Sequence, residues 1–253
     1  MNKSILLKQR EIIKDVYKEL DLPTRRLFIK NTLSLGMLSM LTGCSLTDED
    51  SIENVLMIAS RFNDQIQSWI FDPSKMAPTY PESMITKPFP FNAYYSEDEI
   101  RESPTNFQLK VSGLVENKKS LTLTDLNEMP QISQITRHIC VEGWSAIGKW
   151  GGIRFSDFLQ RIGADTSARY VGFICHDDYY TSIDMETALH AQTLLTLKFS
   201  DEILPAKYGY PLKLRIPTKL GYKNPKYIQE IFVTNRNPGG YWEDQGYNWF
   251  GGS

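Results

Sequence analysis

RHICVEGW, residues 137–144, carries the strongest chemical signal in this 253-residue sequence. Residues 135–141 have the composition of a β-strand, and the side chains of a strand alternate between its two faces. The alternation predicts that His138, Cys140 and Glu142 share one face. A thiol between an imidazole and a carboxylate is an unusual set to bury in a core, so we expect this strand to belong to a functional site.

Four roles for Cys140 are compatible with these residues. It can pack like alanine in the core, or form a disulfide with Cys175. It can be a catalytic thiolate with His138 as its partner, although neighbours on one strand face are poorly placed for proton transfer. It can also be a metal ligand. The three histidines lack the paired spacing of a closed zinc site, whereas one soft thiolate suits a metal whose other ligands come from a cofactor.

Shorter strand and helix signals flank this stretch on both sides. Predicted strands cover residues 107–111 and 121–123 as a hairpin, then 170–175, 212–216 and 227–234. Predicted helices cover residues 124–128, 156–162 with a cap at Ser156, and 184–190 with a cap at Asp184. Strands and short helices mix without a regular βαβ alternation, so the sequence predicts an α+β fold with a mixed sheet in a single domain.

The composition excludes several classes of protein. With 41% hydrophobic, 12% aromatic and 23% charged residues, the chain can bury a sizeable core, which excludes disorder and a disulfide framework. The 28 Lys and Arg residues nearly balance the 30 Asp and Glu residues, giving a net charge of -2. Without a global basic field, nucleic acid is not an expected partner.

Two adjacent arginines, Arg25 and Arg26, precede an uncharged run over residues 31–43. This run is shorter than the roughly 20 apolar residues that span a bilayer. A cationic region before a short apolar stretch is typical of a signal peptide, and the paired arginines resemble the twin-arginine export signal. Because that route carries folded proteins, often with a cofactor already bound, we expect a cofactor site downstream.

LTGC, residues 41–44, resembles a lipoprotein processing site. We therefore predict a twin-arginine signal peptide with a lipobox over residues 1–43, an anchor segment with a helix over 44–72, and a catalytic domain over 73–253. Lipidated Cys44 would hold a periplasmic or otherwise extracytoplasmic protein at the membrane. The alternative is an unmodified Cys44 near an ordinary cleavage site.

Three motifs follow one another in the second half of the sequence. They are CVEGWS at 140–145 with WGGIRFSDFL at 150–159, then YGYPLKLRIP at 208–217 with GYKNPKYIQEI at 221–231, and finally GYWE at 240–243 with GY at 246–247. Together they resemble the molybdopterin-binding domain of the sulfite oxidase family, and are most similar to its periplasmic methionine-sulfoxide reductase branch. The similarity covers roughly Phe89 to the C-terminus.

This resemblance implies a molybdenum-molybdopterin (Mo-MPT) cofactor whose metal takes a thiolate from Cys140, because metal charge favours the deprotonated sulfur. By the same resemblance, Asn92, Tyr95 and Ser96 contact the cofactor. Its phosphate would lie near Lys213, Lys223 and Lys226 and the backbone of Asn224 and Pro225, since ammonium groups and turn amides suit a phosphate.

Three positions depart from the branch pattern. Lys213 stands in place of an arginine, which keeps the charge but loses the bidentate fork. Tyr208 replaces an asparagine at a cofactor contact, and Cys175 replaces a threonine. We expect Cys175 to line the cofactor pocket without binding the metal.

The residues after Cys140 favour one direction of chemistry. Sulfite-oxidising relatives place cationic residues there, whereas this chain has Glu142 and Trp144. An acidic, aromatic mouth suits a neutral S-oxide or N-oxide held against an indole. We therefore expect an enzyme that reduces such an oxide by oxygen-atom transfer, with Cys140, Glu142 and Trp144 as catalytic residues.

Electrons would come from a membrane or soluble donor, such as a haem protein. The alternatives are oxidation of a small sulfur compound such as sulfite, with electrons passed to a cytochrome, and a lipid-anchored binding domain without activity. The retained Cys140 disfavours the second. We expect a monomer, because the dimerisation domain of sulfite oxidases does not follow the cofactor domain here.

Overall fold

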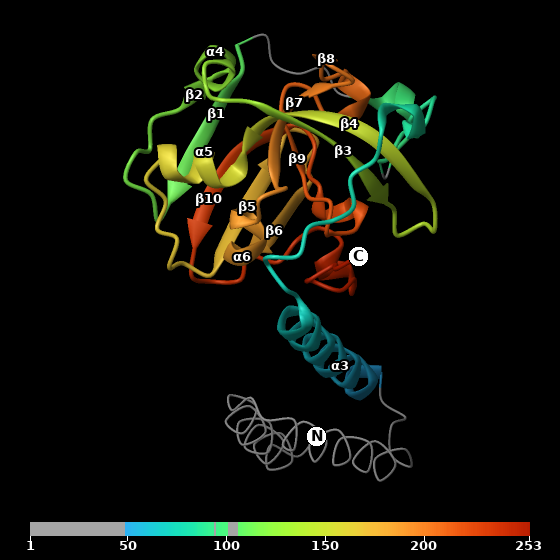
Figure 1. Ribbon diagram of the computed structural model, residues 1–253. Helices are drawn as coiled ribbons and strands as arrows, with labels where there is room; N and C mark the ends of the chain where they lie inside the picture. The colour runs from blue at the N-terminus through green and yellow to red at the C-terminus, as the bar shows by residue number, and fades with distance from the viewer. Residues whose placement is uncertain (1–48, 94, 101–105) are drawn as a thin grey trace. The chain divides into compact units, whose positions relative to one another are not determined.

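Two five-stranded sheets dominate the computed structural model, which describes residues 49–93, 95–100 and 106–253 (Figure 1). The first sheet has the order β2-β1-β10-β5-β6. Its strands are β1 (Gln108–Gly113), β2 (Leu121–Thr122), β5 (Tyr170–Cys175), β6 (Tyr180–Asp184) and β10 (Ile228–Thr234). β1 and β10 run parallel and the other neighbours antiparallel, so the predicted mixed sheet is confirmed.

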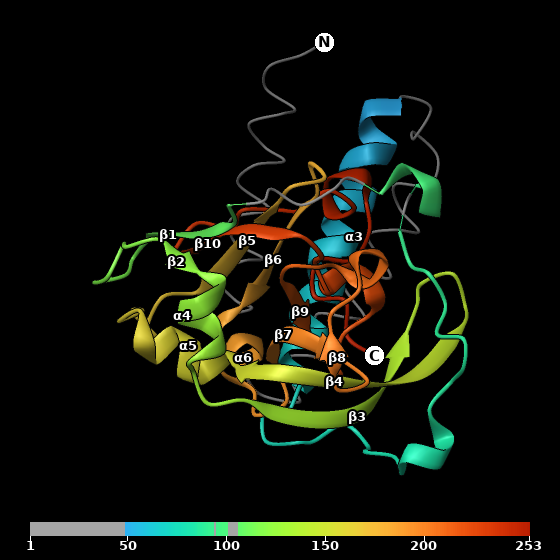
Figure 2. The same ribbon diagram turned by 90° about the horizontal axis from the view of Figure 1, so that it is seen from above.

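The second sheet is antiparallel, with the order β3-β4-β7-β8 and β9 paired to β7. Its strands are β3 (Ile132–Ile139), β4 (Ser145–Arg154), β7 (Leu194–Phe199), β8 (Glu202–Ile203) and β9 (Lys213–Arg215). Figure 2 shows β3 and β4 on one side of the fold and β1, β10 and β5 on the other. The main apolar core includes buried side chains from strands of both sheets, so packing joins them in one unit.

The helices are few and short apart from the first. They are α3 (Glu49–Ile70), α4 (Leu123–Asn127), α5 (Phe155–Arg161) and α6 (Met185–Leu189), with 3-10 turns at Glu82–Met84, Glu97–Glu99, Ala206–Tyr208, Gly221–Lys223 and Glu243–Gln245. α5 and α6 contact each other, and Phe155, Phe158 and Ala188 from them are buried in the main core. The α+β class is therefore confirmed.

Two helix caps test the local predictions. The Asp184 carboxylate accepts the backbone N–H of Thr187 at 2.6 Å, as expected of an N-cap. The predicted cap at Ser156 is wrong: α5 begins one residue earlier, after Arg154, and has no side-chain cap. Phe155 is completely buried, and this anchoring against the core sets the start of the helix.

Strand β4 has no counterpart among the predicted elements, because its three glycines weaken the strand signal. At Gly152 the structure shows why glycine is present. A Cβ there would lie 2.1 Å from the carbonyl oxygen of Leu195 on β7. Close approach of the two backbones therefore excludes any side chain at this position.

The described residues from Met57 to Ser253 form one compact unit, and residues 49–56 belong to an N-terminal unit. The predicted signal peptide over 1–43 and Cys44 lie outside the described residues. α3 supplies the helix expected between anchor and domain. Within the described part of the chain, no helix has the length and apolar character needed to cross a membrane.

Candidate active site

Cys140 lies immediately after β3, at the start of a tight turn into β4. The Cys140 N–H donates to the carbonyl of Trp144 at 2.9 Å, and the N–H of Gly143 donates back to Cys140 at 3.2 Å. Gly143 has φ +91°, a conformation that favours glycine. β3 ends at Ile139, two residues before Val141, where the predicted strand ends. His138 and Cys140 are both buried, as their alternation predicts, whereas Glu142 belongs to the turn and is exposed.

The turn nevertheless brings Glu142 back to the sulfur. The Cys140 thiol lies 3.6 Å from Glu142 Oε2, and the same oxygen accepts the Trp144 indole N–H at 2.8 Å. From the other side, Asn92 Nδ2 donates to Cys140 Sγ at 3.2 Å. The sulfur therefore has one amide donor and one carboxylate beside it.

Burial raises the pKa of the Cys140 thiol, and the Glu142 carboxylate adds to this effect. A thiol with a raised pKa is a poor nucleophile at neutral pH. A bound metal cation would reverse the balance, because it stabilises the thiolate directly. The environment therefore favours a metal ligand over an unassisted catalytic thiolate.

A disulfide to Cys175 and a metal site formed by protein side chains alone do not fit the structure. Cys140 and Cys175 are both free, so the alternative of a disulfide between them is wrong. The described residues contain no group of three or more His, Cys, Asp or Glu side chains that could hold a metal alone. Any metal at Cys140 would need ligands from outside the described chain, as a cofactor provides.

Cys140 opens into a cavity of about 230 Å³. Its polar lining comes from Asn92, Cys140, Glu142, Asp177 and Lys226, and its aromatic lining from Tyr95, Tyr179, Tyr222, Trp242 and Tyr247. Asp177 accepts the Tyr95 hydroxyl at 3.1 Å, and burial raises the pKa of this carboxyl. The cavity therefore combines a thiol, two carboxylates and an aromatic wall.

Trp144 is not among the residues that line this cavity. Its indole is turned toward Glu142 and lies 5.7 Å from the His138 ring, centroid to centroid. Trp242 contributes the indole of the wall instead. Trp242 belongs to the third motif, 98 positions further along the chain than Trp144, whose catalytic role stays a prediction.

A smaller cavity adjoins the first and shares Asn92 and Lys226 with it. It is also lined by Tyr208, Lys213 and His138. Lys213 Nζ donates to the carbonyl of Asn224 at 3.2 Å, and Lys226 Nζ to that of Lys207 at 3.3 Å. Behind them, the buried Arg215 guanidinium donates to the Asn224 side-chain oxygen at 3.0 Å.

Two buried lysines, Lys213 and Lys226, line this smaller cavity, and Arg215 is a third buried cation bonded to Asn224. Burial lowers the pKa of Lys226 to about 8 and that of Arg215 to about 9. Burial, with repulsion from the other two, also lowers the pKa of Lys213 well below its ordinary value. Among the described residues, none of the three forms a salt bridge within 4 Å. An anion bound here would relieve the repulsion, which makes the cavity suited to a phosphate.

The same cations, together with burial as the main cause, hold the pKa of His138 well below its ordinary value. The ring is therefore neutral and has one N–H donor and one acceptor nitrogen. It makes no hydrogen bond to Cys140 or to any other described residue, so the alternative of a catalytic thiolate partnered by His138 has no hydrogen bond to support it.

Seven of the residues predicted to contact the cofactor line one or both of the two cavities. Asn92, Tyr95, Asn224, Pro225 and Lys226 line the Cys140 cavity, while Tyr208 and Lys213 line the smaller one. Tyr208 also donates its hydroxyl to the carbonyl of Phe89 at 2.8 Å, which anchors the loop that carries Asn92. These seven residues come from separate segments and converge on one site.

Three other predicted positions lie elsewhere. The Ser96 side chain bonds to Glu99 and caps a 3-10 turn on the surface. Lys223 forms a buried ion pair with Glu243 and does not join Lys213 and Lys226. The Cys175 thiol is fully buried beneath the sheet, and burial raises its pKa well above the ordinary value.

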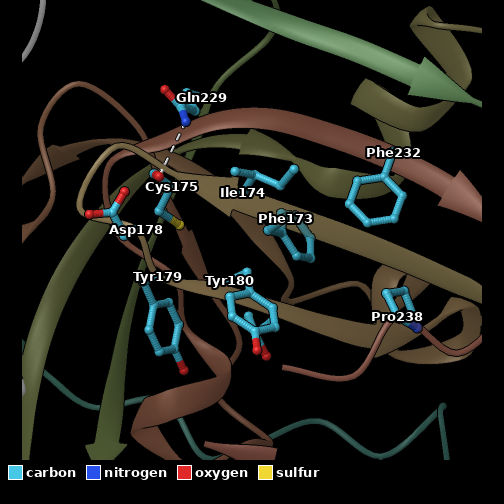
Figure 3. Close-up of a pocket in the computed structure, with 10 residues that line it drawn as sticks. Phe173, Ile174, Cys175, Asp178, Tyr179, Tyr180, Gln229, Phe232 and Pro238 are labelled. Atoms are coloured by element: carbon cyan, nitrogen blue, oxygen red, sulfur yellow. Dashed lines mark hydrogen bonds between the residues drawn. The ribbon is translucent and has the colours of Figure 1, made fainter. Parts of the chain in front are cut away.

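A second hollow of about 330 Å³ lies over β5, β6 and β10 (Figure 3). Phe173, Ile174 and Phe232 give it an apolar wall, and the Gln229 side chain donates to the carbonyl of Cys175 at 3.3 Å there. Cys175 is among its lining residues, but no lysine or arginine is. Chemistry is therefore expected in the Cys140 cavity.

Several site residues had no individual sequence signal. Asp177 follows a strand in an ordinary polar turn, Arg215 reads as a strand residue, and Tyr179 as a hydrophobic one. Trp242 and Tyr247 belong to the third motif, and their position in that motif is the signal that could have found them. Only long-range packing brings these residues to Cys140.

The fold is an α+β domain, and its site consists of two adjoining cavities. The larger contains the buried Cys140 thiol, and the smaller is lined by Lys213 and Lys226. Over residues 97–242 the sequence matches the family described as the oxidoreductase molybdopterin binding domain. The chain belongs to this family, the sulfite oxidase family, and is an oxidoreductase. The resemblance noted in its three motifs is thereby confirmed.

Individual relatives agree with this placement. The chain is 63% identical to a protein of Azospira oryzae provisionally named protein-methionine-sulfoxide reductase subunit YedZ1, over 96% of this chain and 94% of that one. It is 29% identical to the protein-methionine-sulfoxide reductase catalytic subunit MsrP of Ralstonia nicotianae, over 70% of this chain but 62% of that relative.

A solved structure supports the fold alone. The sulfane dehydrogenase SoxCD of Paracoccus pantotrophus superimposes with a TM-score of 0.51 at 18% identity, over 54% of this chain and 40% of that one.

Proposed function

We propose that this protein is an exported molybdenum-cofactor oxidoreductase that reduces an S-oxide, such as methionine sulfoxide, by oxygen-atom transfer. The observation that carries the proposal is the position of the Cys140 thiol. It opens into a cavity that adjoins a smaller one lined by Lys213 and Lys226, buried lysines with no salt bridge to any residue that the structure describes. A thiol beside such cationic groups is the donor set that a phosphorylated, metal-bearing cofactor requires. When bound, Mo-MPT supplies two-electron oxygen-atom transfer.

The residues present fit that cofactor. Cys140 would provide the thiolate ligand, and the Asn92 amide would donate a hydrogen bond to its sulfur. The Lys213 and Lys226 ammonium groups would hold the phosphate. The backbone of Asn224 and Pro225 offers no free donor for it, because the Asn224 N–H already donates to the carbonyl of Gly221 and proline has no N–H.

The mouth of the cavity favours a neutral oxide as substrate. Trp242 and Tyr247 offer apolar ring surface, and the exposed Glu142 carboxylate repels an anion such as sulfite. Reduction of a sulfoxide to a sulfide consumes two electrons and two protons and releases water. Glu142 and Asp177 are the carboxyl groups lining the cavity that can deliver those protons. The names of the two relatives above support this substrate class.

Metal analysis and a substrate screen test the proposal. Protein expressed in a host that makes the cofactor should contain molybdenum near one atom per chain and reduce methionine sulfoxide with a dye donor. Cys140→Ser should lose the activity and the molybdenum-thiolate spectroscopic signature. Cys175→Ser is the matched control, because this buried thiol lies away from the Cys140 cavity, and it should keep both. Turnover of sulfite with failure on every oxide would instead support the oxidative direction.

We also propose that the protein is exported by the twin-arginine route, anchored by a lipid on Cys44, and supplied with electrons by a membrane or soluble donor. The sequence of residues 24–44 supports this. The double change Arg25→Lys with Arg26→Lys should leave unprocessed precursor in the cytoplasm, as measured by fractionation. Cys44→Ala should abolish labelling with radioactive palmitate. Normal export of the double variant would contradict the route, and labelling of Cys44→Ala would contradict the anchor.

A further inference from the structure

His138 is a buried polar residue to which the proposed mechanism assigns no role. It lies on β3, two positions before Cys140, and 2% of its surface is exposed. Both ring nitrogens are buried, and neither has a hydrogen-bond partner among the described residues. Burial of an imidazole without hydrogen-bond partners destabilises the folded protein. Such a cost is unusual unless a ligand supplies the missing partner.

The ring borders the cavity that would hold the cofactor. It lines the smaller cavity together with Asn92, Lys213 and Lys226. Gly221 lies beside both nitrogens: a Cβ on that glycine would lie 2.9 Å from His138 Nε2 and 3.4 Å from Asn92 Nδ2. Glycine at position 221 therefore avoids a side chain that would crowd the imidazole.

The packing around His138 holds the ring in this orientation. The Phe89 and Trp144 rings lie 6.2 and 5.7 Å from it, centroid to centroid, on the adjoining loops. These rings offer apolar contact and no acceptor oxygen. The side chain is therefore buried against apolar rings and is one of the residues that line the smaller cavity.

We propose that His138 is a cofactor-binding residue, whose Nε2 forms a hydrogen bond to the pterin portion of Mo-MPT. This inference rests on the proposed function, since it requires that cofactor. His138 does not line the larger cavity where substrate would enter. Its role is therefore to hold and orient the cofactor, and not to act on the substrate.

The first test is retention of the cofactor by the loaded protein. Molybdenum and pterin bound per chain are measured during dialysis against a urea concentration below the unfolding transition. His138→Leu, which keeps bulk but no hydrogen bond, should release the cofactor about tenfold faster than the natural protein, the factor expected for one lost hydrogen bond. His138→Gln places an amide nitrogen near the Nε2 position and should restore much of the retention.

The matched control is His190→Gln. His190 is also buried, at 3% exposed, but it bonds to the carbonyl of Lys75 and accepts the N–H of Gln192, away from both cavities of the site. This variant should lose stability and retain the cofactor at the natural rate. The comparison separates cofactor binding from a general effect of removing a buried histidine.

The second test compares loaded and cofactor-free protein. In cofactor-free protein, from a host that cannot make the pterin, His138→Leu should unfold at the same or a higher temperature than the natural chain, because it removes two unsatisfied nitrogens. In loaded protein the same change should lower the unfolding temperature. A purely structural histidine would shift both in the same direction.

The outcomes distinguish this inference from the proposed function. Absence of molybdenum and pterin from the natural protein would overturn the proposed function and the role of His138 with it. A loaded natural protein together with natural retention by His138→Leu would overturn the role of His138 alone. If His138→Leu does not fold, His138→Gln and His138→Asn decide, since asparagine reaches only the Nδ1 position. Slower release from the glutamine variant supports the inference, and equal rates overturn it.

Discussion

At the scale of single residues, the Cys140 sulfur lies between two groups with opposite effects on its charge. Burial is the main cause of its raised pKa. The Glu142 carboxylate adds to the rise by repelling the thiolate, whereas the Asn92 amide lowers the pKa by donating to the sulfur. The sulfur is therefore kept protonated until a cation arrives, which protects it from unwanted chemistry in cofactor-free protein.

This balance predicts opposite shifts for two variants of the metal-free protein. Asn92→Ala should raise the pH at which Cys140 alkylation by iodoacetamide is half-maximal, because a donor to the thiolate is lost. Glu142→Gln should lower it, because a like charge is removed. Peptide-resolved mass spectrometry separates Cys140 from Cys175. Ser96→Ala is the control and should leave the profile unchanged, while shifts in the same direction for both variants would refute the account.

At the scale of elements, the path of β4 depends on two adjacent glycines with different surroundings. The pairing of β4 with β7 shifts register between Gly151 and Gly152, which marks a bulge. A Cβ on Gly152 would lie 2.1 Å from the β7 backbone at Leu195, whereas one on Gly151 would come no nearer than 3.2 Å, to Lys198 Cβ. The contact at Gly151 requires a small shift, but the one at Gly152 requires the paired strand to move away.

We therefore expect Gly152→Ala to be much more damaging than Gly151→Ala. Overpacking against backbone costs about 1 to 3 kcal/mol or more, which lowers the Tm of a domain of this size by roughly 3 to 10 °C. Gly151→Ala should lie within about 2 °C of the natural protein. Calorimetry of both variants measures the difference in Tm. Equal Tm values would show that β7 can shift away from β4 to accommodate the added methyl group.

At the scale of the whole molecule, buried lysines join segments that are distant in sequence. Lys219 Nζ lies 2.9 Å from the Phe250 ring centroid and 5.0 Å from that of Phe71, and it is 3.6 Å from the Asp184 carboxylate. The Asp64 carboxylate accepts the N–H of Phe250 at 2.9 Å. The C-terminal residues are thus tied both to α3 and to the cap of α6.

The charge of Lys219 should appear in the pH dependence of stability. Burial lowers its pKa to about 7, although Asp184 acts in the opposite direction. Below pH 7 Lys219 is protonated in both the folded and the unfolded chain, so burial of its charge destabilises the folded state. Between pH 7 and the ordinary lysine pKa the unfolded chain binds more protons, so stability rises with pH.

We expect urea unfolding at pH 7, 8 and 9 to show this rise. Lys226, whose pKa is lowered to about 8, contributes with the same sign. Lys219→Met should remove roughly 1 to 2 kcal/mol of the increase between pH 7 and 9. Lys149→Met, which alters a surface lysine paired with Glu82 and Asp201, should keep the natural slope. An unchanged slope in Lys219→Met would mean that Lys219 stays protonated in the folded protein between pH 7 and 9, so that its pKa is not lowered.

Local sequence predicted those features whose cause is local. The bounds of β5 and the cap at Asp184 follow from strand alternation and from one side chain's hydrogen bond to its own helix. The α+β class and the importance of Cys140 follow from patterns and motifs within a few residues. For these features, the interacting groups are neighbours in the chain, so their order in the sequence is enough.

Only the tertiary structure decided which side chains meet at the site. It placed Trp242 and not Trp144 in the cavity wall, paired Lys223 with Glu243 and left Ser96 on the surface. It also placed His138 at the smaller cavity, with no hydrogen-bond partner among the described residues. It also required Gly152 on β4, which the sequence pattern did not show to be a strand. Each of these outcomes depends on packing between segments that lie far apart in the sequence. Burial and the close approach of backbones determine such contacts, and the spacing of residue types along the chain does not reveal them.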